Sequence, residues 1–275
     1  MSLATKYRPK DFNELVGQNE VTTILMNELQ NNKVKQAYIF EGGTGQGKTT
    51  TSLILANKLN GLTVNFDVAI HNSVDDIKQL LEYVKQKPID YDRIIIILDE
   101  VQNIFNRKDS PAAQALLKIL EEPPKHVIFI MCTTEGDKII DTIKNRCEVL
   151  HFSNVSIDAM FQRLRYICSM EHIIYVSDDA LIEIAKRSNG SMRNAITNLE
   201  KLSSLGDITI ANVTKTLASK YDDMFKLLYA YFDEDINTIV SIINNIDDID
   251  KFVSAFFTFV LDIGVFMKTH NINLT

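Results

Sequence analysis

The stretch EGGTGQGKTT, residues 41–50, links an apolar run of strand length, AYIF at residues 37–40, to a helical pattern, SLILANKL at residues 52–59. Residues 42–49 match G-x-x-x-x-G-K-[ST], in which glycines let backbone N–H groups turn toward phosphate oxygens. A helix that follows such a loop adds its positive end to the same anion site. The stretch therefore predicts an α/β fold that binds a nucleoside triphosphate at this loop.

Further apolar runs alternate with helical patterns through the first half of the chain. They lie at residues 63–69, 93–98, 126–131 and 148–152. Continuously apolar runs are typical of parallel strands that are buried on both faces. Helix starts are also visible, because Ser73 and Asp76 have capping-box spacing and Ser110 directly precedes Pro111. We therefore expect an α/β domain with a mostly parallel sheet over residues 1–155.

Strand patterns stop after this domain, and the rest of the chain has helical spacing. We expect a small helical domain at residues 156–219 and a third, helical segment at residues 220–275. Residues 221–275 hold nine Asp or Glu and three Lys, so they contribute −6 to a net charge of −7. This balance argues against a protein that coats DNA nonspecifically, but it leaves room for a local basic surface before residue 220.

The cysteines and the hydropathy pattern exclude several other classes of protein. Cys132, Cys147 and Cys168 form no C-x-x-C pair, so the chain cannot build a four-cysteine zinc site or a disulfide framework. The apolar stretch at residues 252–267 is interrupted by Asp262 and is shorter than the ~18–20 residues of a membrane span. We expect a cytoplasmic protein with no zinc and no membrane partner.

Four residues have the chemistry to bind and hydrolyse a triphosphate. In the loop motif, Lys48 reaches the β- and γ-phosphates and the Thr49 hydroxyl binds Mg²⁺. Asp99 and Glu100 follow the most apolar run of the chain. A carboxylate at the end of a buried strand suits Mg²⁺ coordination through water, and its neighbour could polarise the attacking water. The alternative is a pair of solvated carboxylates at a strand exit.

Two more features are less specific by themselves. Thr133 and Thr134 follow an apolar run, and a hydroxyl there could position the water or sense the γ-phosphate. An ordinary polar strand end is the alternative. Arg146 stands between a short helix and a strand and would, on its own, be an ordinary surface arginine.

Seven motifs together carry a wider resemblance. They are KYRPKDFNELVGQ (6–18), the glycine-rich loop, LDE (98–100), ALLKILEEPP (115–124), CTTE (132–135), NRC (145–147) and GSMRNAITNLEKL (190–202). In this order they resemble the AAA+ clamp-loader ATPases, in particular the bacterial DNA polymerase III γ/τ subunit and the small subunits of replication factor C. The resemblance implies an AAA+ P-loop NTPase domain, then a helical lid domain and a short helical collar segment.

The resemblance also implies the residues that contact ATP. The adenine end would be lined by Tyr7, Arg8, Val16 and Gly17, and the phosphates would be held by Gly42, Thr44, Gly45, Gln46, Gly47, Lys48, Thr49 and Thr50. Asp99 would anchor Mg²⁺ together with Thr49, and Glu100 would be the general base.

Three further roles follow from the same likeness. Thr134, or the adjacent Thr133, would be the sensor-1 residue, and Arg193 would be the sensor-2 arginine of the lid. Arg146 would be an arginine finger that completes the site of the neighbouring subunit.

The implied function is that of an ATPase subunit in a sliding-clamp loader. Its partners would be other loader subunits in a ring-like oligomer, expected to be a pentamer, with the sliding clamp and primer–template DNA. ATP and Mg²⁺ would be the cofactors, while residues 61–73 lack the cysteines of the family's zinc module. A short chain of this family without the zinc module would be expected in a bacterial or phage-infected cell. A non-hydrolysing scaffold subunit and another AAA+ DNA motor, of the helicase or initiator type, are the alternatives.

Overall fold

The computed structural model describes the chain except for residues 71–72, 106–109, 218–219, 245, 247–248 and 270–275. The described chain divides into two compact units, Met1–Val213 and Thr214–Thr275. The expected boundary near residue 155 falls inside the first unit. The division into three domains therefore stays a prediction, and the two units are described separately.

The first unit contains a five-stranded parallel sheet. Its strands are β1 (Ala37–Glu41), β2 (Gly61–Asp67), β3 (Arg93–Asp99), β4 (Val127–Thr133) and β5 (Glu148–His151), in the order β2-β3-β4-β1-β5. All five predicted strands and the parallel α/β class are confirmed. The second strand begins earlier than predicted, because Gly61 already pairs with Arg93, and it ends where Asp67 pairs with Asp99.

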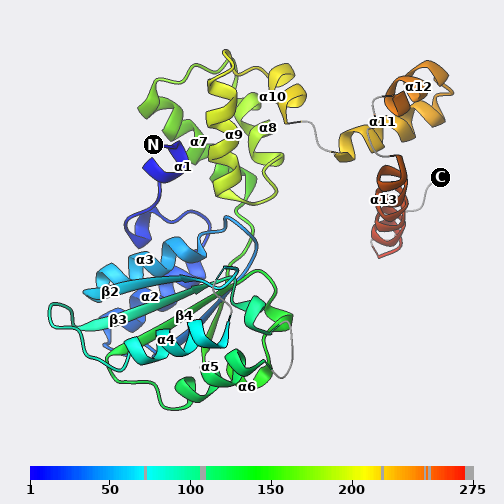
Figure 1. Ribbon diagram of the computed structural model, residues 1–275. Helices are drawn as coiled ribbons and strands as arrows, with labels where there is room; N and C mark the ends of the chain where they lie inside the picture. The colour runs from blue at the N-terminus through cyan, green and yellow to red at the C-terminus, as the bar shows by residue number, and fades with distance from the viewer. Residues whose placement is uncertain (71–72, 106–109, 218–219, 245, 247–248, 270–275) are drawn as a thin grey trace. The chain divides into compact units, whose positions relative to one another are not determined.

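The central strand β3 shows why these sequences are continuously apolar. Ile96 and Leu98 belong to one buried cluster, while Ile95 and Ile97 belong to another. Helices cover both faces (Figure 1): α2 (Asn19–Gln30) and α3 (Lys48–Lys58) on one, α4 (Val74–Tyr83), α5 (Pro111–Glu121) and α6 (Asp141–Lys144) on the other. The capping box at Ser73 and the N-cap at Ser110 are both present.

The parallel arrangement brings the carboxyl ends of the strands to one edge of the sheet. Glu41 pairs with Thr133 at that edge, and Asp67 pairs with Asp99. The phosphate-loop sequence leaves β1 at the same edge and enters α3 at Lys48. Ligands of open α/β sheets bind at this edge. A nucleotide site is therefore expected here.

The rest of the first unit is helical, as predicted. It comprises α7 (Ile157–Glu171), α8 (Asp178–Lys186), α9 (Met192–Ser203) and the start of α10 (Ile210–Thr216), within which the first unit ends. The short helix α1 (Leu3–Lys6) at the start of the chain packs against α9, where the Leu3 N–H donates to Glu200 Oε1 at 3.2 Å. The N-terminal segment is therefore attached to these helices before the chain reaches the sheet. The short 3-10 helices η1 (Phe12–Glu14), η2 (Val101–Phe105) and η3 (Gly136–Lys138) complete this unit.

The second unit consists of three helices, α11 (Lys220–Phe232), α12 (Ile236–Asn244) and α13 (Ile249–Thr269). Phe225 and Phe259 meet edge to face with ring centroids 4.7 Å apart. Other large apolar side chains of this unit are exposed, among them Tyr229, Phe232 and Phe257. In the described part of the chain, none of the helices has the length and apolarity to cross a membrane.

Candidate nucleotide site

Two glycines give the phosphate loop its shape. Gly45 and Gly47 have φ angles of 77° and 106°, a region that glycine adopts without steric cost. A Cβ on Gly45 would also lie 2.1 Å from Ser191 Oγ, at the N-cap of α9. The loop and α9 therefore approach so closely that a larger residue would force them apart.

Lys48 is almost buried, with 8% of its surface exposed. Its Nζ donates to the carbonyl oxygens of Gly42 and Gly43, at 2.6 and 2.8 Å. Burial lowers the pKa of the Lys48 ammonium, while nearby acidic groups act in the opposite direction. The loop thus holds a desolvated cation against its own carbonyl groups, which phosphate oxygens could replace as acceptors.

Thr49 and Asp99 form a pair of oxygen ligands at the edge of the sheet. Thr49 Oγ1 donates to Asp99 Oδ1 at 3.0 Å and lies 3.3 Å from Oδ2. Hydroxyl and carboxylate oxygens are hard ligands that suit Mg²⁺, which keeps several waters and binds phosphate oxygens. Within the described residues, no group of three or more His, Cys, Asp or Glu is arranged to hold a metal ion. The Thr49 hydroxyl and the Asp99 carboxylate fit a metal that also binds phosphate oxygens of a nucleotide.

Glu100 follows directly and has an unusual backbone. Its φ of 53° lies in the left-handed region, which non-glycine residues seldom adopt. Gln102 Nε2 and Thr134 Oγ1 both donate to Glu100 Oε2, the second at 3.2 Å. Thr133 is fully buried and donates instead to Gln102 Oε1 at 2.8 Å. Of the two sensor-1 candidates, Thr134 is thus the one that contacts the expected general base.

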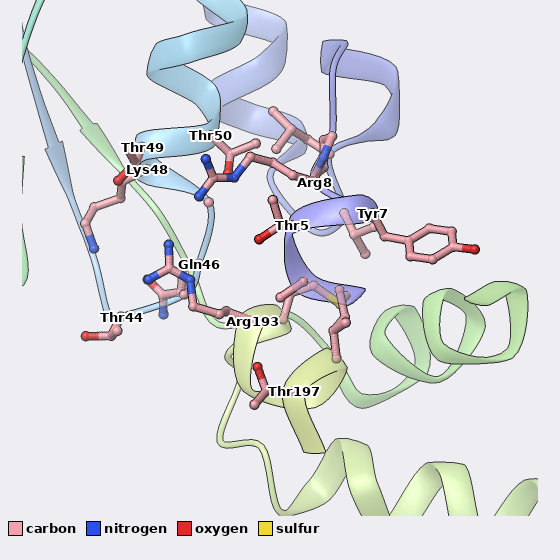
Figure 2. Close-up of a pocket in the computed structure, with 18 of the residues that line it drawn as sticks. Thr5, Tyr7, Arg8, Thr44, Gln46, Lys48, Thr49, Thr50, Arg193 and Thr197 are labelled. Atoms are coloured by element: carbon pink, nitrogen blue, oxygen red, sulfur yellow. The ribbon is translucent and has the colours of Figure 1, made fainter. Parts of the chain in front are cut away.

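A cavity of about 650 Å³ unites most of the expected residues. Figure 2 shows Arg8 and Arg193 with their guanidinium groups directed toward the phosphate loop, from the N-terminal segment and from α9. The lining includes these expected residues: Tyr7, Arg8, Val16, Thr44, Gly45, Gln46, Gly47, Lys48, Thr49, Thr50, Asp99, Glu100 and Arg193. Drug-sized ligands occupy cavities of ~300–1,000 Å³, so a nucleotide matches this volume.

Tyr7 lies at the wall of the cavity, but its ring turns away from the phosphate loop (Figure 2). Its hydroxyl donates to Glu171 of α7, and its ring meets Tyr166 edge to face at 6.3 Å. The hydrogen bond to Glu171 is the main cause that raises the pKa of Tyr7 to about 12. Arg163 donates to the Tyr7 carbonyl oxygen at 3.0 Å. Tyr7 therefore ties the N-terminal segment to α7 as well as bordering the cavity.

Four expected residues are absent from the described lining of this cavity: Gly17, Gly42, Thr134 and Arg146. Gly17, with a φ of 78°, packs against Val155, and Gly42 offers its carbonyl to Lys48. Arg146 donates through Nη2 to Glu121 Oε1 at 2.9 Å and through Nη1 to the Thr142 carbonyl. Arg146 is therefore engaged elsewhere on the surface of its own chain.

Other lining residues were given no role in the sequence analysis, although some of them lie within its motifs at residues 6–18 and 190–202. The set comprises Ser2, Ala4, Thr5, Pro9, Leu15, Asp67, Arg163, Met192, Ile196 and Thr197. Asp67 could have been found, because it ends a strand at the same edge as Asp99. The residues of α1, α7 and α9 could not, since their position depends on how these helices pack.

Comparisons with known proteins agree with this fold. Residues 63–156 match the family model described as DNA polymerase III, delta subunit, and residues 162–203 match the RCF1/5-like AAA+ ATPase lid domain. The structure of the Thermotoga maritima RuvB Holliday junction branch migration motor aligns with a TM-score of 0.65 at 19% identity, covering 82% of this chain and 80% of that one. Fold and site together define a P-loop ATPase fold of the AAA+ class.

Curated relatives give the family. The DNA polymerase III subunit gamma of Buchnera aphidicola subsp. Baizongia pistaciae is 32% identical over 273 residues, which cover 90% of this chain and 72% of that protein. The gamma/tau subunit of Mycoplasma genitalium is 31% identical and the tau subunit of Escherichia coli 30%, over 98% and 88% of this chain. The chain belongs to the DNA polymerase III gamma/tau family. It spans 50% and 41% of the lengths of the last two relatives.

Proposed function

We propose that this chain is an ATPase subunit of a sliding-clamp loader, which couples ATP binding and hydrolysis to opening the clamp and loading it on primer–template DNA. One observation carries the proposal: Lys48, Thr49, Asp99 and Glu100 all line one nucleotide-sized cavity. A subunit that had lost hydrolysis would not need to keep all four groups. Membership of the gamma/tau family supports the link to replication.

The four groups divide the chemistry of hydrolysis among them. Lys48 and Arg193 would bind the phosphate oxygens. Arg8, which the resemblance assigned to the adenine end, would join them, because its guanidinium is directed toward the phosphate loop (Figure 2). Thr49 and Asp99 would hold Mg²⁺. Bound Mg²⁺ would neutralise part of the charge on the β- and γ-phosphates. Glu100 would accept a proton from a water whose oxygen bonds to the γ-phosphorus, while the bond to the bridging oxygen breaks and ADP leaves with the electron pair.

The proposed partners follow from the family and from Arg146. Arg146 would reach the nucleotide of a neighbouring subunit in a ring-like oligomer, and a pentamer is the stoichiometry we propose. The sliding clamp and primer–template DNA would then bind the assembled ring and trigger hydrolysis, in the cytoplasm of the cell whose DNA is replicated. Contacts to DNA would be mainly to phosphates, which reconciles DNA binding with a net charge of −7.

The test is the steady-state rate of ATP hydrolysis by the purified chain, alone and with any loader subunits that are encoded with it. Each preparation is measured without additions, with the clamp, with primer–template DNA, and with both. We expect a low basal rate that rises sharply when clamp and primed DNA are both present. A rate that ignores the clamp but rises with branched or duplex DNA would indicate a helicase-like motor instead. ATP binding without hydrolysis in every mixture would indicate a scaffold subunit.

A further inference from the structure

Gln102 is a nearly buried polar residue that the proposed chemistry does not yet use. It lies in η2, directly after the Asp99–Glu100 pair, and 5% of its surface is exposed. A buried amide is costly unless its donors and acceptor are satisfied. The partners that satisfy Gln102 are therefore informative, and all of them belong to the catalytic edge of the sheet.

The orientation of the Gln102 amide is fixed from both of its ends. Thr133 Oγ1 accepts the Glu135 N–H at 3.0 Å, so its own proton is available for Gln102 Oε1 at 2.8 Å. At the other end, a carboxylate can only accept, so the group that faces Glu100 must be the amide nitrogen. The second amide proton points to Thr134 Oγ1 at 3.1 Å. A flipped amide would break this chain of donors and acceptors.

This chain of hydrogen bonds is directed at one oxygen of the Glu100 carboxylate. Oε2 receives the Gln102 amide and the Thr134 hydroxyl, whereas neither group donates to Oε1. The left-handed backbone at Glu100 and the bond from the Asn103 N–H to the Glu100 carbonyl, at 3.1 Å, fix the base of the side chain. The carboxylate is thus held in one orientation, with Oε1 as the oxygen that can accept a proton from water.

We propose that Gln102 is a positioning residue that connects the end of β4 to the general base, so that Thr133 sets the orientation of the Glu100 carboxylate through the Gln102 amide while Thr134 holds the same carboxylate oxygen directly. The inference rests on the proposed function, because it assigns Gln102 a role in the same hydrolysis. It also gives the two adjacent threonines separate roles. Thr133 orients the amide, and Thr134 shares with the amide the task of holding the carboxylate.

The experiment compares Gln102→Ala with Asn103→Ala in the full chain, assembled with its loader partners. Asn103 lies next to Gln102 in η2 and bonds to Glu100 through its backbone, which alanine keeps. ATP affinity is measured by titration with a fluorescent analogue, and kcat by steady-state hydrolysis at saturating ATP. We expect Gln102→Ala to lower kcat by up to ~10²-fold, because a small misplacement of a catalytic group has this effect. ATP affinity should not change, and Asn103→Ala should hydrolyse at the wild-type rate.

A double-mutant cycle separates positioning from a general structural role. Because Gln102 acts through Glu100, adding Gln102→Ala to Glu100→Gln should cause little further loss of kcat. Thr133→Val removes the hydroxyl that orients the amide but keeps the side-chain volume, so it should lower kcat in the same direction even if Gln102→Ala fails to fold. Thr133→Ser should restore the rate.

The outcomes distinguish this inference from the proposed function. If the wild type hydrolyses ATP but Gln102→Ala and Thr133→Val match its kcat, the positioning role is wrong and the ATPase proposal stands. An equal, additive loss in the Glu100→Gln background would also overturn the positioning role, since Gln102 would then act independently of the carboxylate. A wild type that binds ATP without hydrolysing it would overturn both proposals.

Discussion

Lys48 and Arg146 are two cations with opposite surroundings. Lys48 is 8% exposed, lines the nucleotide cavity and donates to carbonyl oxygens of its own loop. The Arg146 side chain is 34% exposed and makes an ion pair with Glu121, whose side chain is 49% exposed. Among the described residues that line the cavity, Arg146 is absent.

This difference assigns Lys48 to the binding of ATP and Arg146 to the rate of its hydrolysis. A buried cation inside the cavity can serve a nucleotide that the same chain binds, whatever the state of assembly. An exposed arginine outside it can serve a nucleotide only when another surface is brought to it. The isolated chain is therefore expected to bind ATP, but to hydrolyse it quickly only in an assembly.

The largest expected effect is that of Arg146→Ala on stimulated hydrolysis. An arginine supplied by a second protein can accelerate phosphoryl transfer by ~10³–10⁵-fold, and we expect a loss of this order in the assembled loader with clamp and DNA. ATP affinity should be unchanged. Arg165→Ala, at an exposed arginine of α7, is the matched control. Retained stimulation in Arg146→Ala would remove the distinction between the two cations.

Where the ring holds several copies of this chain, mixing two variants tests whether Arg146 acts on a neighbouring subunit. Arg146→Ala chains keep an intact Glu100, and Glu100→Gln chains keep an intact Arg146. If the arginine acts on a neighbour, a mixture of the two should hydrolyse ATP faster than either variant alone. If Arg146 acted within its own chain, mixing would recover nothing.

The next effect is that of Lys48→Ala on ATP binding. Loss of one partner from a buried, charged hydrogen bond costs ~2–5 kcal/mol, or roughly 30- to several thousand-fold in affinity. Titration with a fluorescent ATP analogue measures it, and Lys33→Ala, at an exposed lysine, is the control. Affinity close to that of the wild type would show that Arg8 and Arg193 suffice for the phosphates.

A smaller effect concerns stability without nucleotide. Burial lowers the pKa of Lys48, so the folded chain disfavours the charged form and Lys48→Met should raise the free energy of unfolding. The sign of the pH dependence follows. The penalty is complete below the folded pKa and disappears as the pH rises to the unfolded value of about 10.5. Denaturant titrations at neutral and alkaline pH should show the advantage of Lys48→Met shrinking, and a constant advantage would contradict it.

The sequence predicted well what depends on neighbours along the chain. Continuous apolar runs located the strands, and the glycine spacing located the loop, because both patterns report local backbone geometry. The register at Thr133 and Thr134 could not be decided, since both are hydroxyls at the same strand end. The structure distinguishes them by their contacts. Thr133 is fully buried, whereas the Thr134 hydroxyl donates to the Glu100 carboxylate.

What the sequence could not predict depends on contacts between distant segments. The Gln102 amide is oriented by a hydrogen bond from Thr133, 31 residues away, and the Tyr7 hydroxyl donates to Glu171, 164 residues away. The motif KYRPKDFNELVGQ placed Tyr7 near the adenine end but could not give the direction of its ring. The Tyr7 ring is oriented by the contact of the N-terminal segment with the helices that follow residue 156, and the Gln102 amide by the residues at the end of β4. No local sequence pattern encodes either contact.

The smallest expected effect is that of Glu121→Ala on stability, and it tests whether Arg146 is free to change partners. Exposed ion pairs contribute ~0.2–1 kcal/mol and are screened by salt, so the loss in free energy of unfolding should stay in this range and vanish at high ionic strength. Glu122→Ala, at the adjacent exposed glutamate, is the control. A bond this weak can be exchanged for the phosphate of a neighbouring nucleotide at little cost. A loss of several kcal/mol that is insensitive to salt would instead mean that Arg146 stays paired with Glu121 of its own chain. Lys48 and Arg146 would then differ in location but not in role.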